Sequence, residues 1–196
     1  MQTQQPQKNS INIHPATKED AEDLALIHVE GWRSSYDGLV PAEFLDGLDR
    51  AKYAANWAEW LGAGTTEALI AHDPDGKAAG FVSFGKLRTP IPGMSPIRPL
   101  YAAEIYAVYI LPAYWRAGLG RRLLGEAAVA LREKKLKSLC LWVMEGNKRA
   151  VSFYKALGGQ RIGSKKVEIG GRTLTEIAFG WRDSAVLSPQ SAPEKP

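Results

Sequence analysis

The apolar positions of the chain follow two kinds of pattern, stripes with helical spacing and short runs that are continuous or alternate. Apolar residues three and four apart share one face of a helix, whereas short apolar runs between turn residues are typical of strands. The pattern predicts a strand at 11–14, helices at 18–33, 44–48 and 53–61, strands at 68–71, 79–87 and 100–111, a helix at 118–133, a strand at 138–143, a helix at 147–157, and strands at 161–169 and 172–181.

Two features of this pattern indicate the fold class. The run at 100–111 is apolar and aromatic with almost no polar break apart from Glu104, which is typical of a strand buried on both faces. Gly170-Gly171 separates the last two strands, and two glycines at that place favour a hairpin turn. Because helices and strands are interleaved along the chain, we expect a single-domain mixed α/β sheet with a parallel core, flanked by helices.

Three segments lack an apolar pattern. Residues 1–10 and 184–196 hold too little apolar surface to offset the entropy of ordering them, so we expect two disordered tails around a domain at 11–183. Residues 88–99 contain four prolines and a glycine, which predicts a surface loop.

Composition narrows the class of protein. Hydrophobic residues make up 45% of the chain and charged residues 23%, as in soluble globular proteins. No stretch approaches the ~20 consecutive apolar residues that span a bilayer, and the first residues lack the apolar centre of a signal peptide. The single cysteine, Cys140, excludes an internal disulfide. We therefore expect a cytoplasmic protein with no membrane partner.

The net charge of +4 suggests an anionic ligand without identifying it. The basic residues include separate pairs at 121–122, 134–135 and 165–166. Nucleic-acid binders usually gather their positive charge on one face, so we expect no nucleic-acid partner. A nucleic-acid binder would reveal itself by an affinity that falls steeply with salt.

The segment 104–124 joins the apolar run to a helix through the loop Gly118-Leu119-Gly120. Glycines let backbone N–H groups face a ligand, and a helix N-terminus carries about half a positive charge, so this turn suits a phosphate. Arginines at 116, 121 and 122 add charged donors. A Walker A loop is excluded because Arg121-Arg122 follow Gly120, and the dinucleotide fingerprint is excluded because Leu123 replaces its third glycine.

A third kind of phosphate loop fits the segment, which resembles the pyrophosphate loop of the GNAT N-acetyltransferases, Arg/Gln-x-x-Gly-x-Gly/Ala. Residues 115–120 match at both glycines, with Trp115 in place of Arg or Gln. The element order over 11–181 is also similar to that of the family. The resemblance implies acetyl-CoA as co-substrate, with its pyrophosphate on the loop and its pantetheine arm along the preceding strand. The implied cofactor-binding residues in this part of the chain are Val108, Tyr109, Ile110, Arg116, Ala117, Gly118, Leu119, Gly120 and Arg121.

Residues 147–159 are similar to the other family signature, Asn-x-x-Ala-x-x-Phe-Tyr-x-x-x-Gly-Phe, with Gly159 in place of the final aromatic residue. In the family the asparagine binds the cofactor and the tyrosine protonates the departing thiolate, which implies these roles for Asn147 and Tyr154. The residues taken alone are also explained by an N-cap at Asn147 and a core aromatic at Tyr154.

Acetyl transfer from a thioester needs no protein nucleophile, because the thiolate is already a good leaving group. It needs a neutral amine, N–H groups for the oxyanion and an acid for the thiolate. A lysine-type amine has a reference pKa of ~10.4, so a base must take its proton at pH 7. Glu104, acting through water, is the candidate catalytic base, with Glu145 in reserve; a structural carboxylate paired with an arginine is the alternative for Glu104. Cys140 is expected to be a buried strand residue.

The acceptor side gives weaker signals. Trp32 and Tyr36 lie at the end of the first long helix, a region that borders the acceptor groove in the family, so substrate contact is implied for both and core packing is the alternative. His14, His28 and His72 show no paired metal-ligand spacing, and no metal site is expected.

The sequence thus predicts an N-acetyltransferase that moves an acetyl group from acetyl-CoA to the primary amine of a small molecule or a peptide. A non-catalytic CoA-binding or regulatory module is the alternative. Small amines, polyamines, aminoglycosides, amino acids and protein N-termini all fit as acceptors. Homodimers are common in such families, and nothing in the sequence specifies one.

Overall fold

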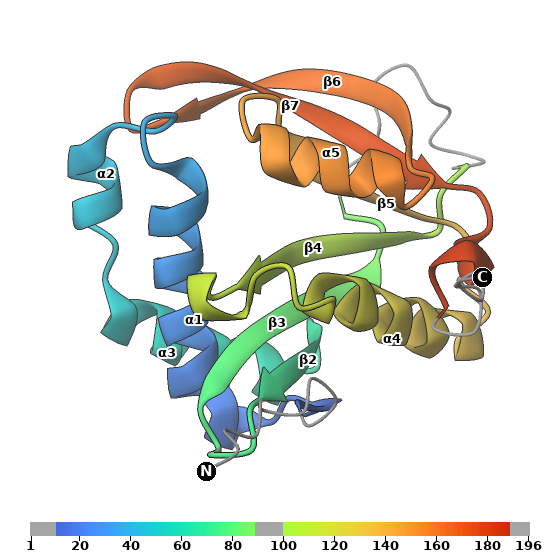
Figure 1. Ribbon diagram of the computed structural model, residues 1–196, viewed down its shortest axis with the longest axis horizontal. Coiled ribbons are helices and arrows are strands. Elements are labelled where there is room, and N and C mark those ends of the chain that lie inside the picture. Colours follow the sequence, from blue (N-terminus) through green and yellow to red (C-terminus); the bar gives the residue numbers. More distant parts are fainter. Residues whose placement is uncertain (1–10, 89–99, 189–196) are drawn as a thin grey trace, which may run out of the picture.

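The computed structural model describes residues 11–88 and 100–188, which form one sheet with helices on both faces (Figure 1). The strands are β1 (Asn12–Pro15), β2 (Glu67–His72), β3 (Ala78–Lys86), β4 (Ala103–Ile110), β5 (Leu139–Met144), β6 (Gln160–Ile169) and β7 (Arg172–Trp181). The helices are α1 (Ala21–Tyr36), α2 (Ala42–Asp46), α3 (Arg50–Gly62), α4 (Leu119–Glu133) and α5 (Lys148–Ala156), with short 3-10 turns η1 (Lys18–Asp20), η2 (Pro112–Tyr114) and η3 (Ser184–Leu187). Each helix and strand that the pattern predicts is present.

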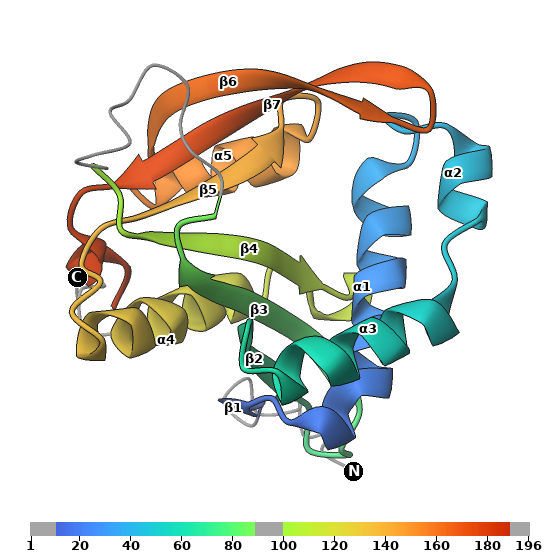
Figure 2. The same ribbon diagram turned by 180° about the vertical axis from the view of Figure 1, so that it is seen from behind.

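The strands lie in the order β1-β2-β3-β4-β5-β7-β6. Every neighbouring pair is antiparallel except β4 and β5, so the mixed sheet is confirmed and its parallel core is this one pair. Helices α4 and α5 pack their apolar stripes on one face of the sheet. Helices α1 and α3 cover the other face, as the view from behind shows (Figure 2).

Strands β4 and β5 separate soon after they begin. They pair only through Ala103–Ile105 and Leu139–Leu141, and only the first three residues of β4 are buried, whereas residues 106–110 are partly exposed. The expectation of a strand buried on both faces is therefore wrong for the second half of β4. The side chains at 107–110 still pack on the helices of both faces. This half is exposed at its edge toward β5, where no strand of the described residues lies beside it.

A second connection joins the two halves of the sheet where β4 and β5 have diverged. An apolar cluster, here called the bridging cluster, contains Val40, Leu45 and Met144, with Trp32, Tyr36, Phe44, Leu48, Ile169 and Leu174 packed around them. It holds α2 against the tip of the β6–β7 hairpin. At that tip a Cβ added to Gly170 would lie 2.9 Å from Cβ of Phe44, and both Gly170 and Gly171 have positive φ, as the predicted hairpin turn requires.

Helix α1 runs on to Tyr36, past the predicted end at residue 33. Trp32 and Tyr36 therefore lie within its last turns. Gly31 allows the helix to approach β4 closely, because a Cβ at this position would lie 2.6 Å from the ring of Tyr109.

The ordered chain also extends beyond its predicted end. Residues 184–187 form η3, in which Ser184 and Leu187 are buried and Leu187 joins the core under α4, so the expectation of disorder from residue 184 onward is wrong for these residues. The predicted tail at 1–10, the loop at 89–99 and residues 189–196 lie outside the described residues. In the described ranges no helix is both long and apolar enough to cross a membrane.

Candidate active site in the cleft between β4 and β5

The divergence of β4 and β5 leaves a cavity of about 810 Å³. Its walls come from β4, the loop that follows it, the start of α4, β5, α5, the end of α1 and the β6–β7 hairpin. All but one of the residues predicted for the site line this cavity: Trp32, Tyr36, Glu104, Val108, Tyr109, Ile110, Arg116, Gly118, Leu119, Gly120, Arg121, Asn147 and Tyr154. The exception is Ala117, which belongs to the same loop but does not line the cavity.

The loop before α4 has the backbone of an anion site. Gly118 is the N-cap of α4 with φ +82°, Arg116 has φ +61°, and no side chain caps the first N–H groups of the helix. A Cβ at Gly118 would meet no atom within 4 Å, whereas a Cβ at Gly120 would lie 3.1 Å from Ile110 and 3.2 Å from Phe153. Gly118 therefore provides the left-handed turn and an open approach to the helix N-terminus, while Gly120 allows β4, α4 and α5 to pack closely.

The arginines of this loop do not all face the cavity. Arg116 and Arg121 line it. Arg122 instead donates from Nη2 to the carbonyl oxygen of Ile11, 3.0 Å away. The expectation that Arg122 adds a donor for a phosphate is therefore wrong, because its place on α4 turns it toward the start of β1.

Trp115, the departure from the family loop, has two contacts in the structure. Its Nε1–H donates to the carbonyl oxygen of Ile110 at 2.7 Å, and the guanidinium carbon of Arg149 lies 3.4 Å from the centre of its ring. Burial, followed by the charge of Arg116, lowers the pKa of Arg149. The sequence analysis does not predict a role for Arg149. The family pattern has Arg or Gln at the position of Trp115, and here the guanidinium beside the loop comes from Arg149 on α5 instead.

The diverging half of β4 presents its backbone to the cavity. Residues 106–110 have no register partner on β5, so the peptide groups on that edge face the cavity. The side chains of Val108 and Ile110 pack into the core under α4 and that of Tyr109 packs under α1, which leaves the backbone as the accessible part. The carbonyl of Ile110 is already bonded to Trp115.

Tyr154 is both a core aromatic and a cavity residue. It is 8% exposed and packs against Phe153, Phe179 and Trp181. Burial, with a further contribution from the nearby Tyr36 phenol, raises the pKa of Tyr154 well above its usual range. The phenol therefore keeps its proton at neutral pH, as a proton donor must.

Two more tyrosines, Tyr36 and Tyr109, lie near Tyr154. The hydroxyl groups of Tyr36 and Tyr109 lie 3.5 Å apart, and burial raises the pKa of each. All three phenols are thus neutral at pH 7 and can donate a proton or a hydrogen bond. Trp32 packs edge-on against Tyr36, so the two predicted acceptor residues belong both to the cavity wall and to the bridging cluster.

Glu104 is a buried carboxylate at the point where β4 and β5 still pair. It is 5% exposed, and its Oε2 accepts the backbone N–H of Arg88 at 2.9 Å. The Arg88 guanidinium lies instead over the ring of Tyr106 and donates to Oγ1 of Thr66. The hydrogen bond at Oε2 therefore comes from the backbone of Arg88.

Two other groups from the sequence analysis are not placed for catalysis. Cys140 pairs with Glu104 across the parallel ladder and is fully buried. Burial, together with the Glu104 charge, raises the pKa of its thiol to about 12, so it remains a protonated strand residue as expected. Glu145, the reserve base, forms an ion pair with Arg161 at 3.1 Å and does not line the cavity, so it is wrong as a candidate base.

Asn147 has the geometry of an N-cap. Its side-chain oxygen accepts the N–H of Ala150 at 3.1 Å, and the residue is 9% exposed. The capping role is therefore present in the structure, and the amide NH₂ is the part of the side chain left to donate into the cavity that Asn147 lines.

The sequence analysis does not predict a charged pair on the cavity wall that the β6–β7 hairpin forms. Lys165 and Glu176 line the cavity, with Nζ and Oε2 3.3 Å apart and Nζ 4.3 Å from the centre of the Trp142 ring. The signal was the hairpin register: a two-residue turn at 170–171 places these two residues opposite each other.

Comparisons with known proteins agree with this architecture. The model of the acetyltransferase (GNAT) family matches residues 31–158, which include Glu104, the glycine loop and Tyr154. The uncharacterized N-acetyltransferase YuaI of Bacillus subtilis is 32% identical over 177 residues, covering 90% of this chain and 96% of that protein. The spermidine N(1)-acetyltransferase of Thermoplasma acidophilum is 24% identical over 149 residues, covering 74% of this chain and 85% of that protein.

Among solved structures, the PaiA N-acetyltransferase from Thermoplasma acidophilum in complex with coenzyme A superposes with a TM-score of 0.64. It is 24% identical and the match covers 85% of this chain and 98% of that one, so it shows a shared fold. Since the family model spans the glycine loop and the second signature, and a relative aligns over almost its whole length, this chain belongs to the acetyltransferase (GNAT) family and is an acyltransferase.

Proposed function

We propose that the protein transfers an acetyl group from acetyl-CoA directly to the primary amine of a small molecule or a peptide. One observation carries the proposal: a single cavity brings together the uncapped N-terminus of α4, the unpaired edge of β4 and the protonated phenol of Tyr154. The cytoplasm is the location that the proposal implies.

The loop and its arginines fit the pyrophosphate of acetyl-CoA. Among the described residues, no side chain caps the first N–H groups of α4 and no atom lies within 4 Å of a Cβ built on Gly118. A phosphate can therefore approach the positive end of the helix. Arg116, Arg121 and Arg149 supply positive charge from three positions on the cavity wall. When bound, acetyl-CoA supplies an acetyl group activated as a thioester.

The edge of β4 fits the pantetheine arm. Backbone groups of residues 106–109 have no partner on β5, and an extended amide chain can bond them as a further strand would. An N–H group on this edge can also bond the carbonyl oxygen of the acetyl group as negative charge develops there.

Two side chains can move the protons. Glu104 is the base that accepts a proton from the acceptor amine through water, and Tyr154 is the acid that donates its proton to the departing sulfur. The acceptor lies against Trp32 and Tyr36, on the side of the cavity where Glu176 is paired with Lys165. A cationic acceptor group gains a carboxylate partner there by taking the place of Lys165.

A panel of amines tests the function directly. Purified protein is incubated with acetyl-CoA and each member of a set of small amines, polyamines, aminoglycosides, amino acids and peptides. We expect thiol release together with an acceptor mass increased by one acetyl group. Tight acetyl-CoA binding without transfer to any acceptor would instead support a non-catalytic CoA-binding module.

Glu104→Gln should lower kcat/KM at neutral pH by about a hundredfold if the carboxylate is the base. The amide oxygen can still accept the Arg88 N–H, and circular dichroism checks that the variant is folded. The rate of the variant should then rise about tenfold per pH unit, because without the base only the neutral fraction of the amine reacts. A variant with the wild-type pH profile and rate would show that Glu104 has only a structural role.

Arg149→Ala should weaken acetyl-CoA binding by about tenfold, since one charge-assisted contact is worth about 1.5–3 kcal/mol and solvent screening lowers this for an exposed side chain. The matched control is Arg161→Ala, which removes an arginine that is paired with Glu145 outside the cavity. Calorimetry at two salt concentrations measures both. Equal affinities for the two variants would remove Arg149 from the binding site.

A further inference from the structure

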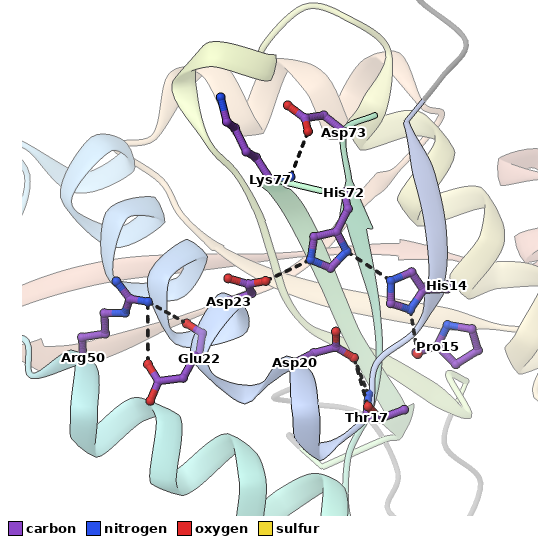
Figure 3. A network of polar contacts seen from close by, with 10 residues as sticks. All are labelled: His14, Pro15, Thr17, Asp20, Glu22, Asp23, Arg50, His72, Asp73 and Lys77. Carbon is purple, nitrogen blue, oxygen red and sulfur yellow. Dashed lines mark hydrogen bonds and ion pairs between the residues drawn. The ribbon is translucent and has the colours of Figure 1, made fainter. Parts of the chain in front are cut away.

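Two histidines that are far apart in the sequence meet at the edge of the sheet opposite β6 (Figure 3). His14 on β1 and His72 on β2 point at each other, with Nε2 of His14 3.1 Å from Nδ1 of His72. Asp20, at the end of η1, joins them: one ligand atom of each of these three residues lies within 4.8 Å of the others. Among the residues that the structure describes, no other group of three such side chains comes this close.

The outer nitrogen of each ring already has an acceptor. Nε2 of His72 lies 3.0 Å from Oδ2 of Asp23, and Nδ1 of His14 lies 3.1 Å from the carbonyl oxygen of Pro15 (Figure 3). A carbonyl and an ionised carboxylate can only accept, so both outer nitrogens carry hydrogens. In the neutral rings, which lie 12° from parallel, the two inner nitrogens therefore face each other with lone pairs. An ion beside the line that joins them accepts both pairs once the rings turn toward it, which removes their repulsion.

We propose that His14, His72 and Asp20 bind a divalent transition-metal ion of the zinc type. Two nitrogens on a tetrahedral zinc ion lie about 3.3 Å apart, given Zn–N distances of about 2.0–2.1 Å, and the observed separation is 3.1 Å. Asp20 has to move about 1.5 Å closer to complete the set. Its Oδ2 accepts from the backbone N–H and the hydroxyl of Thr17, so the carboxylate is held close to the two histidines and has to shift from this position to bind the ion.

The surroundings suit such an ion. Asp23 behind His72 and the Pro15 carbonyl behind His14 are the outer partners that metal-bound histidines usually have, and they fix which nitrogen faces the ion. Asp20 and Asp23 together carry two negative charges, which offset a divalent cation. Two imidazoles favour zinc, cobalt, nickel or copper over magnesium and calcium. The Asp23 side chain is 42% exposed and that of His72 15%, so solvent reaches the cluster.

The ion would fasten β1 to the rest of the fold. Strand β1 lies at the edge of the sheet and pairs only with β2, and the proposed ligands connect β1, β2 and the start of α1. None of these residues lines the cavity between β4 and β5. The proposed metal site is therefore structural, and its test does not depend on whether the protein transfers acetyl groups.

The test uses the full chain without a histidine tag, freed of metal with a chelator and then desalted. Titration with Zn²⁺ in a calorimeter should show a single equivalent bound, and Co²⁺ should develop the visible absorption of a tetrahedral complex. Zn²⁺ at a hundredfold excess over Kd should raise Tm by about 5–10 °C. Mg²⁺ at the same concentration should leave Tm unchanged.

Variants assign the binding to these residues. Asp23→Asn should weaken Zn²⁺ binding by about 10–100-fold, and His14→Gln and His72→Gln, which remove ligands, by more. Asp37→Asn, a carboxylate change at the other end of α1, is the matched control and should bind Zn²⁺ as the wild type does. Circular dichroism and acetyl-CoA affinity, measured without metal, show that each variant is folded. Absence of Zn²⁺ binding by the wild type, or wild-type affinity in both histidine variants, would overturn the proposal and leave a shared proton between the two rings.

Discussion

Tyr154→Phe should lower turnover by about 10²–10⁴-fold while acetyl-CoA affinity stays within about twofold of wild type. The ring remains packed against Phe179 and Trp181, so the variant loses only the hydroxyl, which we propose donates a proton to the leaving sulfur. The loss should appear in kcat rather than in KM, because this proton transfer belongs to the transition state. The measurement requires an acceptor found in the amine panel and a step limited by chemistry, since slow product release would hide the effect.

Tyr101→Phe provides the matched control for this experiment. Tyr101 is also a buried phenol, 2% exposed, but it packs with Cys140 and Ala178 and does not line the cavity. Both variants should lose about 1 kcal/mol of folding stability at most, and only Tyr154→Phe should lose activity. Tyr36→Phe reports on the neighbouring phenol. If Tyr36→Phe is inactive and Tyr154→Phe is not, the proton donor is Tyr36.

Gly118→Val should weaken acetyl-CoA binding by at least about 10²-fold. A β-branched residue does not adopt the φ of +82° at this N-cap, so the first N–H groups of α4 turn away from the phosphate. The new side chain also projects into the space over the loop that is now empty of protein atoms. Loss of two charge-assisted hydrogen bonds, at about 1.5–3 kcal/mol each, gives this magnitude.

Gly64→Val separates backbone strain from ligand binding. Gly64 has φ +64° and no atom within 4 Å of an added Cβ, so the substitution meets the same kind of strain at the end of α3, outside the cavity. Both variants should lose stability in thermal melts, and Gly64→Val should retain wild-type acetyl-CoA affinity in calorimetry. Unchanged affinity in a folded Gly118→Val would contradict a phosphate site at this loop.

The features that sequence predicts well here are local ones. The glycine loop, the two-glycine hairpin and the helical stripes depend on residues within a few positions of one another, so the pattern contains the information that determines them. The cavity residues follow from the family resemblance once the loop and the second signature are placed. Even the Lys165–Glu176 pair is implied by the hairpin register.

The features that sequence misses depend on distant segments. Nothing in the apolar run at 100–111 indicates that β5 pairs with only its first part, because the divergence is decided by strands that come later in the chain. Arg122 turns to the carbonyl of Ile11, and Trp115 stacks with Arg149, through contacts that helix periodicity does not encode. His14 and His72 show no metal-ligand spacing for the same reason: they lie on neighbouring strands, 58 residues apart.

The bridging cluster has a mechanical consequence for the catalytic cycle. The two halves of the sheet, β1–β4 and β5–β7, are connected at two places. One is the short β4–β5 ladder on one side of the cavity, and the other is the apolar contact of α2 with the β6–β7 hairpin on the opposite side. A hinge motion that opened the cavity would have to break either the β4–β5 ladder or the bridging cluster. We therefore expect the cavity to keep nearly the same width during acetyl transfer, so that the width of an acceptor, more than its length, would limit which acceptors can enter.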